Sequence, residues 1–244
     1  MDIAIISGAS SGIGKCFALL LDSYELDEIW LIGRSHERLC ELTKELTTHT
    51  RLFALDLQDT EAFGTIAKEL SREISIKFLV CSAGVGYNGN FDTLSLEEIS
   101  NMSDTNCRAL TLLNRLCLPY MAKGGRIINI SSGAGFLPQP GFGVYAATKA
   151  YVTSFSRGLY QEVKCKGISV TAVCPGPVDT AFFSGLKDVK EYKRKFLVSP
   201  MSVAEAGLKA SLKGRAVSTP TFSMKLVRFA SKVLPSSLVL KFYK

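Results

Sequence analysis

Two tyrosine–lysine pairs with the same spacing stand out in the second half of the chain. Tyr145 and Lys149 lie in the stretch GFGVYAATKAY, and Tyr160 and Lys164 follow further along. Side chains four residues apart share one face of a helix. Such a pair is either a proton donor beside an ammonium that tunes its pKa, or two neighbours on a helix surface. The surroundings of each pair must decide between these interpretations.

A serine distinguishes the two pairs. Ser132 lies thirteen residues before Tyr145 and follows the strand-like run RIINIS, whereas the residue thirteen before Tyr160 is Ala147, which has no hydroxyl. Ligands of open α/β sheets bind at the carboxyl ends of strands. Tyr145 is also expected to open its helix, just after a glycine-containing loop, and Tyr160 to lie in mid-helix. We therefore predict that the first pair is catalytic and that the second is a surface pair.

The elements that position these side chains alternate between short apolar runs and helix-like stretches. Near-continuous apolar strands between helices are typical of a parallel sheet covered on both faces. The 244 residues, 47% of them hydrophobic, suit one α/β domain with a sizeable core. We predict a three-layer, doubly wound parallel sheet. The expected strands are residues 3–7, 28–33, 51–56, 77–82, 126–131 and 168–174.

A glycine-rich turn follows the first predicted strand. In IAIISGASSGIGKCFALLL, Gly8, Gly12 and Gly14 have the spacing GxxxGxG. Glycine permits a tight turn and the close approach of a pyrophosphate, whose charge favours a helix N-terminus. Ser10 and Ser11 can add hydroxyl donors. The strand before the turn and the helix after it indicate a dinucleotide site rather than a plain turn.

The end of the second strand bears on the choice of cofactor. Dinucleotide folds that prefer NAD usually carry an acid here, but this chain has Gly33, Arg34 and Ser35. Arg34 can pair with a 2′-phosphate through its guanidinium fork, and Ser35 can donate as well. We therefore predict NADP (NADPH) rather than NAD; the alternative is an exposed arginine, with an acid elsewhere serving NAD. Asp56 either accepts from the adenine amino group or caps the helix that begins near Asp59.

Seven short motifs in order give the chain its resemblance to a known family. From residue 2 to about residue 182, about three quarters of its length, it resembles the short-chain dehydrogenase/reductase family. The resemblance implies a Rossmann-type core, a nicotinamide cofactor and a catalytic set of Asn106, Ser132, Tyr145 and Lys149. The motifs are SGASSGIG, DL at 56–57, SAG at 82–84, Asn106, NISSGAG with Ser132, YAATK, and PGPVDT at 175–180.

The resemblance also implies contacts to the cofactor and to a water. Asn106 supports a proton-relay water in this interpretation; the alternative is a helix-bending or core amide. Pro175 and Gly176 turn the backbone under the nicotinamide, and Thr180 and the backbone of Val178 meet its carboxamide. The predicted cofactor-binding residues are Gly8, Ser10, Ser11, Gly12, Ile13, Gly14, Arg34, Ser35, Asp56, Leu57, Ala83, Gly84, Tyr145, Lys149, Pro175, Gly176, Val178 and Thr180.

The chemistry of carbonyl reduction explains the residue types in the catalytic set. The reaction adds a hydride to carbon and a proton to oxygen. Free tyrosine has a pKa near 10, which suits an acid better than a base at neutral pH. A nearby Lys149 ammonium favours tyrosinate, so we expect it to lower the pKa of Tyr145. Lys149 can also hold the ribose hydroxyls, and Ser132 can donate to the substrate oxygen.

The chain departs from the family pattern in three places. Cys81 and Ser82 replace two asparagines of the usual NNAG, and the shorter Ser82 is expected to brace the central strand less well. Ser7 replaces a threonine and keeps the hydroxyl. The C-terminus lacks the glycine-rich strand that packs across a tetramer axis in many members. We therefore expect a homodimer through helices near 106–121 and 146–165.

The C-terminal segment carries a concentrated positive charge. No acidic residue follows Glu205, but eight basic ones do, whereas the first 205 residues carry 21 basic and 22 acidic side chains, a net charge of −1. Residues 1–220 are the predicted catalytic domain, and 221–244 a basic amphipathic extension packed on it. The apolar stripe of its helix consists of Phe222, Leu226, Phe229 and Val233, with Lys225, Arg228 and Lys232 between them.

Three interpretations of this stripe remain open. We favour packing on the core with a contribution to the substrate mouth; weak contact with a membrane surface is the second, and a lipophilic substrate entrance the third. Phe182 and Phe183 are expected to line that entrance. The charged run 187–196 is either a solvated stretch or a lid that meets an anionic head such as a CoA phosphate.

Composition excludes several classes of protein. No apolar run reaches the roughly 18 residues of a membrane span, and the chain passes directly from Met1 into a strand, so we expect a cytoplasmic protein without a signal peptide. The seven cysteines form no CxxC, so we expect neither a metal site nor a disulfide framework. The charge-balanced body has no basic stripe, so nucleic acid is not an expected partner.

These observations predict an NADP(H)-dependent oxidoreductase. It interconverts a ketone or aldehyde with an alcohol, and its small-molecule substrate is apolar. The alternative is a nucleotide-binding regulatory protein, or a peripheral membrane protein, that keeps the fold without turnover. The complete Asn–Ser–Tyr–Lys set argues for the enzyme.

Overall fold

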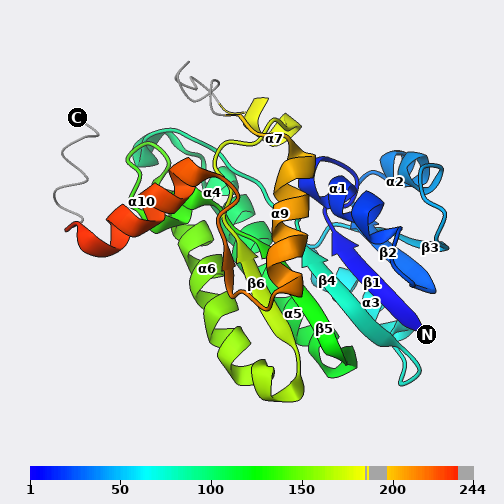
Figure 1. Ribbon diagram of the computed structural model, residues 1–244. Coiled ribbons are helices and arrows are strands. Elements are labelled where there is room, and N and C mark those ends of the chain that lie inside the picture. The colour runs from blue at the N-terminus through cyan, green and yellow to red at the C-terminus, as the bar shows by residue number, and fades with distance from the viewer. Residues whose placement is uncertain (185, 187–196, 236–244) are drawn as a thin grey trace.

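The computed structural model describes residues 1–184, 186 and 197–235, and the charged run 187–196 lies outside them. Seven parallel strands form one sheet in the order β3-β2-β1-β4-β5-β6-β7 (Figure 1). This order winds outward from β1 in both directions, which confirms the predicted doubly wound sheet. The strands are β1 (Asp2–Ser7), β2 (Glu28–Gly33), β3 (Thr50–Ala54), β4 (Ser75–Cys81), β5 (Met121–Ile130), β6 (Ser169–Val173) and β7 (Val217–Ser218).

Helices cover both faces of the sheet (Figure 1). They are α1 (Gly12–Leu21), α2 (His36–Thr43), α3 (Thr60–Glu69), α4 (Leu96–Ser103), a π-helical segment Asp104–Ala109, α5 (Leu110–Cys117), α6 (Gly143–Val163), α7 (Ala181–Ser184), α9 (Pro200–Leu212) and α10 (Phe222–Val233). α1, α2 and α9 contribute to one core, and α3, α5 and α6 to the other.

Alternating burial along the strands explains the two cores. Side chains of a strand point in turn to opposite faces of the sheet. In β1, Ile3 and Ile5 enter one core, whereas Ala4 and Ile6 enter the other, and all four are fully buried. A strand that is apolar on both faces is stable only between two layers of helices.

A buried polar network ties the middle of the sheet to the helices. The Asn114 side chain on α5 donates to Cys81 Sγ at 3.3 Å and to Asn129 Oδ1 at 3.1 Å, and Asn129 donates to Ser156 Oγ on α6 at 3.0 Å. Cys81 therefore has a polar partner at the position where the family carries asparagine. Ser82 is held through its backbone amide instead, which donates to the Ser7 hydroxyl oxygen at 3.2 Å.

The six predicted strands correspond to β1–β6. Their bounds differ from the observed ones by at most two residues, apart from the start of β5. β5 begins at Met121, five residues before the predicted start, and β7 was not predicted. The early part of β5 contains Lys123, Gly124 and Gly125, which break the apolar run. β7 has two residues, too few for any periodicity to appear.

The helix predicted near the C-terminus forms, but the face that was predicted to pack on the core does not. The apolar stripe that was expected to pack on the core is exposed: Phe222 is 73% exposed, Leu226 54%, Phe229 67% and Val233 62%. A different face of α10 packs on the turn Gly133–Phe136. Helical periodicity identifies an apolar face, but it does not say what that face contacts.

Candidate active site

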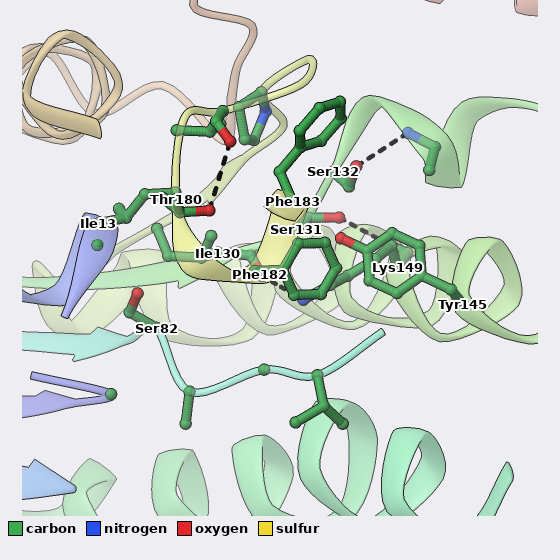
Figure 2. A pocket seen from close by; sticks show the side chains of 18 of the residues that line it. Ile13, Ser82, Ile130, Ser131, Ser132, Tyr145, Lys149, Thr180, Phe182 and Phe183 are labelled. Atoms are coloured by element: carbon green, nitrogen blue, oxygen red, sulfur yellow. Dashed lines mark hydrogen bonds between the residues drawn. The ribbon is translucent and has the colours of Figure 1, made fainter. Parts of the chain in front are cut away.

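One cavity of about 1030 Å³ runs along the carboxyl ends of the strands, from the glycine loop to α10 (Figure 2). Most of the predicted site residues line it. Three do not, namely Gly14, Ser35 and Asn106. The predicted residues that line the cavity are Gly8, Ser10, Ser11, Gly12, Ile13, Arg34, Asp56, Leu57, Ala83, Gly84, Ser132, Tyr145, Lys149, Pro175, Gly176, Val178 and Thr180.

Ser132, Tyr145 and Lys149 come together where β5 ends and α6 begins (Figure 2). Lys149 Nζ donates to the carbonyl oxygen of Ile130 at 3.1 Å and lies 5.6 Å from the centroid of the Tyr145 ring. The Ser131 hydroxyl donates to the Lys149 carbonyl oxygen at 2.7 Å. These contacts join the strand end to the first two turns of the helix, so the cluster is held by regular elements.

Burial sets the protonation states of this cluster. It raises the pKa of Tyr145 to about 12, against a hydrogen bond from Ser132 that lowers it. Burial also lowers the pKa of Lys149 to about 8, and the nearby thiols of Cys107 and Cys174 oppose that shift. Tyr145 is therefore a protonated acid at neutral pH. The predicted lowering of the pKa of Tyr145 by Lys149 is wrong for this structure, because burial of the phenol raises that pKa and Ser132, not Lys149, is the group that opposes the rise.

Two aromatic rings enclose the tyrosine. Phe142 stacks on the Tyr145 ring at a centroid distance of 4.3 Å, and Phe182 packs against it at 5.4 Å (Figure 2). A Cβ at Gly86 would lie 2.5 Å from the Phe182 ring, so a larger residue there would have to displace that ring. Phe182 and Phe183 line the cavity as predicted. Phe142 and Gly86 were missed, because loop geometry rather than helical spacing brings them to the tyrosine.

Asn106 is fully buried in the π-helical segment, outside the cavity. Its Oδ1 accepts from the amide of Val85 at 2.9 Å, and its Nδ2 donates to the Val85 carbonyl at 2.8 Å and to Thr148 Oγ1 at 3.0 Å. Thr148 precedes Lys149 on α6. The side chain thus has the contacts of a core amide, and it joins the loop after β4 to the helix that carries the tyrosine and the lysine.

The glycine loop has the geometry and donors that suit a pyrophosphate. A Cβ at Gly8, whose φ is +67°, would lie 2.7 Å from Ala83 N, and one at Gly14 would lie 2.2 Å from Gly8 O. Ser11 precedes α1 without a side-chain cap, and the first turn of α1 has no acid. The free N–H groups of this helix end, with the hydroxyls of Ser10 and Ser11, therefore form an anion-binding set at the cavity wall.

Arg34 follows β2, is exposed and lines the same cavity. No carboxylate within the described residues forms an ion pair with it. The oxygen of Ser35 accepts from the amide of Arg38 at 3.3 Å and so caps α2, which leaves the hydroxyl proton of Ser35 able to donate.

The structure resolves one of the two interpretations of Asp56. Its carboxylate accepts from the amide of Gln58 at 2.9 Å, whereas the cap of α3 is Asp59, which accepts from the amide of Glu61 at 2.9 Å. Asp56 therefore does not cap the helix. It lines the cavity with its remaining acceptor positions available.

The helix α10 contributes to the cavity wall, as predicted, but the side chains that form this wall were not among those predicted. Ser223, Met224 and Val227 line it, and a Cβ at Gly133 would lie 2.3 Å from Met224 Sδ. The inner face of α10 carries fewer large apolar residues than the outer stripe does, so the hydrophobic pattern gave no signal for it. The second tyrosine–lysine pair, Tyr160 and Lys164, does not line this cavity.

Comparison with known proteins agrees with this geometry. The family model for short chain dehydrogenases matches residues 2–191. The chain is 34% identical over 215 residues to the NADP-dependent 3-hydroxy acid dehydrogenase of Shigella flexneri, covering 84% of this chain and 86% of that protein. It is 36% identical over 183 residues to a very-long-chain 3-oxoacyl-CoA reductase of Danio rerio, covering 70% of this chain and 56% of that protein.

A solved structure extends the comparison to the whole fold. The short-chain dehydrogenase from Sphingobium yanoikuyae in complex with NADPH superposes with a TM-score of 0.82 at 27% identity, covering 98% of this chain and 96% of that one. The matched region includes the glycine loop, the end of β5 and the start of α6. The chain therefore belongs to the short-chain dehydrogenase family and is a nucleotide-binding oxidoreductase of that type.

Proposed function

We propose that this protein is an NADPH-dependent reductase of an apolar ketone or aldehyde, and that it runs in reverse as an alcohol dehydrogenase. The observation that carries the proposal is the cluster of Ser132, Tyr145 and Lys149 in the same cavity as the glycine loop. A proton donor and a site for a nicotinamide nucleotide are the two requirements of carbonyl reduction.

Each side chain of the cluster has a role that follows from its position. A nicotinamide nucleotide, when bound, would supply the hydride for the carbonyl carbon. Tyr145, protonated because its pKa is about 12, donates its proton to the carbonyl oxygen. Ser132 donates a hydrogen bond to the same oxygen and stabilises the charge that develops there. Lys149 holds the ribose hydroxyls, and its ammonium favours the tyrosinate that remains.

Asn106 acts in this proposal as a positioning residue. Its amide joins Val85, which lines the cavity, to Thr148 on the catalytic helix. The Thr148 hydroxyl in turn donates to the carbonyl oxygen of Tyr145 at 2.8 Å. Support of a proton-relay water by Asn106 remains a prediction from the family resemblance.

The apolar lining supports an apolar substrate. The wall beside Tyr145 is formed by aromatic and aliphatic side chains from the loop before α6, from α7 and its continuation, and from α10. One relative is named for a very-long-chain acyl substrate, which is consistent with this wall. The residues are Leu137, Phe142, Phe182, Phe183, Leu186, Met224 and Val227.

Turnover with a panel of carbonyls tests the proposal. We expect oxidation of NADPH with apolar ketones or aldehydes, and a higher kcat/KM as the apolar part of the substrate grows. If the protein binds NADPH and oxidises it with no carbonyl of the panel, the alternative of a nucleotide-binding protein without turnover is correct.

Arg34 provides a specific test of the cofactor. Arg34 lines the cavity and has no carboxylate partner among the described residues, so we propose that it pairs with the 2′-phosphate. Arg34→Asp should lower the ratio of kcat/KM for NADPH to that for NADH by about 10- to 100-fold, since a charged hydrogen bond contributes about 1.5–3 kcal/mol. Arg38→Asp is the matched control, because Arg38 is exposed on α2 and does not line the cavity. An unchanged ratio in Arg34→Asp would remove this residue from the site.

We also propose a homodimer through α5 and α6. Leu112 and Tyr151 are exposed on these helices, and the Tyr151 hydroxyl shares a hydrogen bond of 2.9 Å with Thr111. Sedimentation velocity measures the assembly directly.

A further inference from the structure

The helix α10 has two faces with different neighbours. Its inner face carries Met224 and Val227, which line the catalytic cavity. Its outer stripe, defined as Phe222, Leu226, Phe229 and Val233, is between 54% and 73% exposed. At roughly 100° per residue, these four side chains fall in one narrow sector of the helix. Contiguous exposed apolar side chains of this kind mark an interaction surface.

A row of cations borders the outer stripe. Lys225, Arg228 and Lys232 fall on one side of it, between the stripe and the inner face, at roughly 100° per residue. We call these three residues the basic flank. No acidic residue follows Glu205, which lies in α9, so the segment that carries the flank has no acidic side chain to neutralise it.

The basic flank continues into a second pocket on the body of the protein. The pocket is open to the surface, and three guanidinium groups line it, those of Arg157 on α6, Arg215 before β7 and Arg228 on α10, together with Ser154 and Gln161. Within the described residues, none of the three forms an ion pair. We call this the arginine pocket. Three guanidinium groups without a carboxylate partner, with the hydroxyl of Ser154 and the amide of Gln161 beside them, suit a phosphate group.

We propose that α10 docks onto the surface of a membrane that contains anionic phospholipid. The outer stripe enters the boundary between head groups and acyl chains, and the arginine pocket takes a lipid phosphate. Exposed apolar and cationic side chains on adjacent sectors of one helix are the pattern of helices that lie in this interface. No helix among the described residues is long and apolar enough to cross a membrane, so the contact is with the surface.

Charge favours lipid over a second copy of this chain as the occupant. Two copies joined through their outer stripes would bring two basic flanks close together, with no acid in either α10 to offset them. An anionic bilayer complements the same charges, and a lysine or arginine near such a surface contributes about 1 kcal/mol to binding. The docking does not depend on turnover, so a result that contradicts the proposed function would leave the docking untouched, and the reverse also holds.

Co-sedimentation of the full chain with vesicles tests the docking. We expect binding to vesicles of phosphatidylcholine with phosphatidylglycerol, at least about tenfold weaker binding to phosphatidylcholine alone, and loss of binding as salt is raised. The double variant Leu226→Ser/Phe229→Ser should lose binding. Its melting temperature and NADPH oxidation without vesicles should stay unchanged, because both side chains are exposed. Leu212→Ser, at an exposed apolar position on α9, is the matched control and should bind like the original chain.

The arginine pocket has its own variant. Arg157→Gln/Arg215→Gln should weaken binding to anionic vesicles by about tenfold or more, since each cation contributes about 1 kcal/mol. A truncation after Pro235 should keep the binding, because the stripe and the pocket remain.

Four outcomes would overturn the proposal. The first is no binding of the original chain to anionic vesicles at low salt. The second is undiminished binding of the Leu226→Ser/Phe229→Ser variant. The third is a dimer in the original chain that this variant abolishes while vesicles are ignored, which would make a second copy the occupant. The fourth is unchanged binding in the arginine variant together with inorganic phosphate bound at the pocket in the original chain, which would make the pocket a site for small anions.

Discussion

The same tyrosine–lysine pattern occurs at both ends of α6, with Lys164 just past the last residue of the helix, and the two copies have different environments. Tyr145 and Lys149 are buried at its N-terminal end, in a cavity that Ser132 also lines. Tyr160 lies in the last turn, not in mid-helix as predicted, and packs its ring against the core, while the exposed Lys164 donates to Gln161.

The difference between the pairs shows that spacing places two groups on one face but does not determine their chemistry. The end of α6 that holds Tyr145 lies at the carboxyl ends of the strands, where the cavity is. Burial there raises the pKa of the tyrosine to about 12 and lowers that of the lysine to about 8. Burial also keeps a proton donor and a cation together away from bulk water.

The largest contrast is expected from removal of the two hydroxyls. Tyr145→Phe should lower kcat by about 10²–10⁴-fold, the usual contribution of a positioned acid. Cofactor binding, measured by fluorescence titration with NADPH, should remain. Tyr160→Phe should change kcat by less than about twofold, because this ring does not line the cavity. Equal effects of the two substitutions would show that the cavity does not contain the acid.

Removal of the two ammonium groups should give a smaller contrast. Lys149→Met should lower kcat/KM by about 10²-fold, a typical effect of removing one group that stabilises the developing charge. Lys164→Met is the control, and we expect steady-state kinetics close to those of the original chain because Lys164 is exposed. A Lys149→Met protein with normal kinetics would assign this lysine to packing alone.

The smallest contrast is a pH dependence that only the buried pair confers. Lys149 loses its ammonium as pH rises through about 8, while Tyr145, with a pKa of about 12, stays protonated. The kcat/KM for reduction should therefore be flat from about pH 6 to 8 and then fall about tenfold per pH unit. Lys164→Met should keep this profile.

Loss of the Lys149 proton should raise the free energy of unfolding while it lowers kcat/KM. A loss of activity from this titration can therefore be told apart from a loss caused by unfolding. Lysine in an unfolded chain has a pKa near 10.4, so between about pH 8 and 10 the unfolded state binds more protons than the folded state. The contribution of Lys149 to the free energy of unfolding thus rises with pH as activity falls. Buried cysteines such as Cys81 and Cys174, whose pKa values are raised, lower stability over the same pH range, so Lys149→Met is the comparison. A Lys149→Met protein whose melting temperature responds to pH between about 8 and 10 as that of the original chain does would contradict this assignment.

Much of the fold was predictable, because the sequence patterns that indicate it lie within single strands and helices. The predicted bounds of β2 are those observed, and those of β1 differ by one residue, since apolar runs of this kind need both faces covered. β7 was not predictable. Its two residues form a strand only because β6 offers an edge to pair with.

Some residues of the candidate site were likewise predictable from the sequence, and others were not. Gly8 and Gly14 were predictable, because a glycine-rich turn between strand and helix has few other uses. Phe142 and Met224 were not, since they reach the cavity from a loop before α6 and from α10. Gly86 was not predictable either, since it approaches Tyr145 and Phe182 from the segment after β4. Their neighbours are distant in the chain, and no short-range pattern records such contacts.

The alternation of strands β1 to β6 with helices, the dinucleotide turn and the association of Tyr145 with Ser132 upstream and Lys149 downstream could all be predicted from the amino-acid sequence. These features depend on residue type and spacing along a few turns or strands. The tertiary structure decided which way the pKa of Tyr145 shifts and which face of α10 meets the core. Both depend on how much water reaches a side chain, and that is set by elements that pack from elsewhere in the chain.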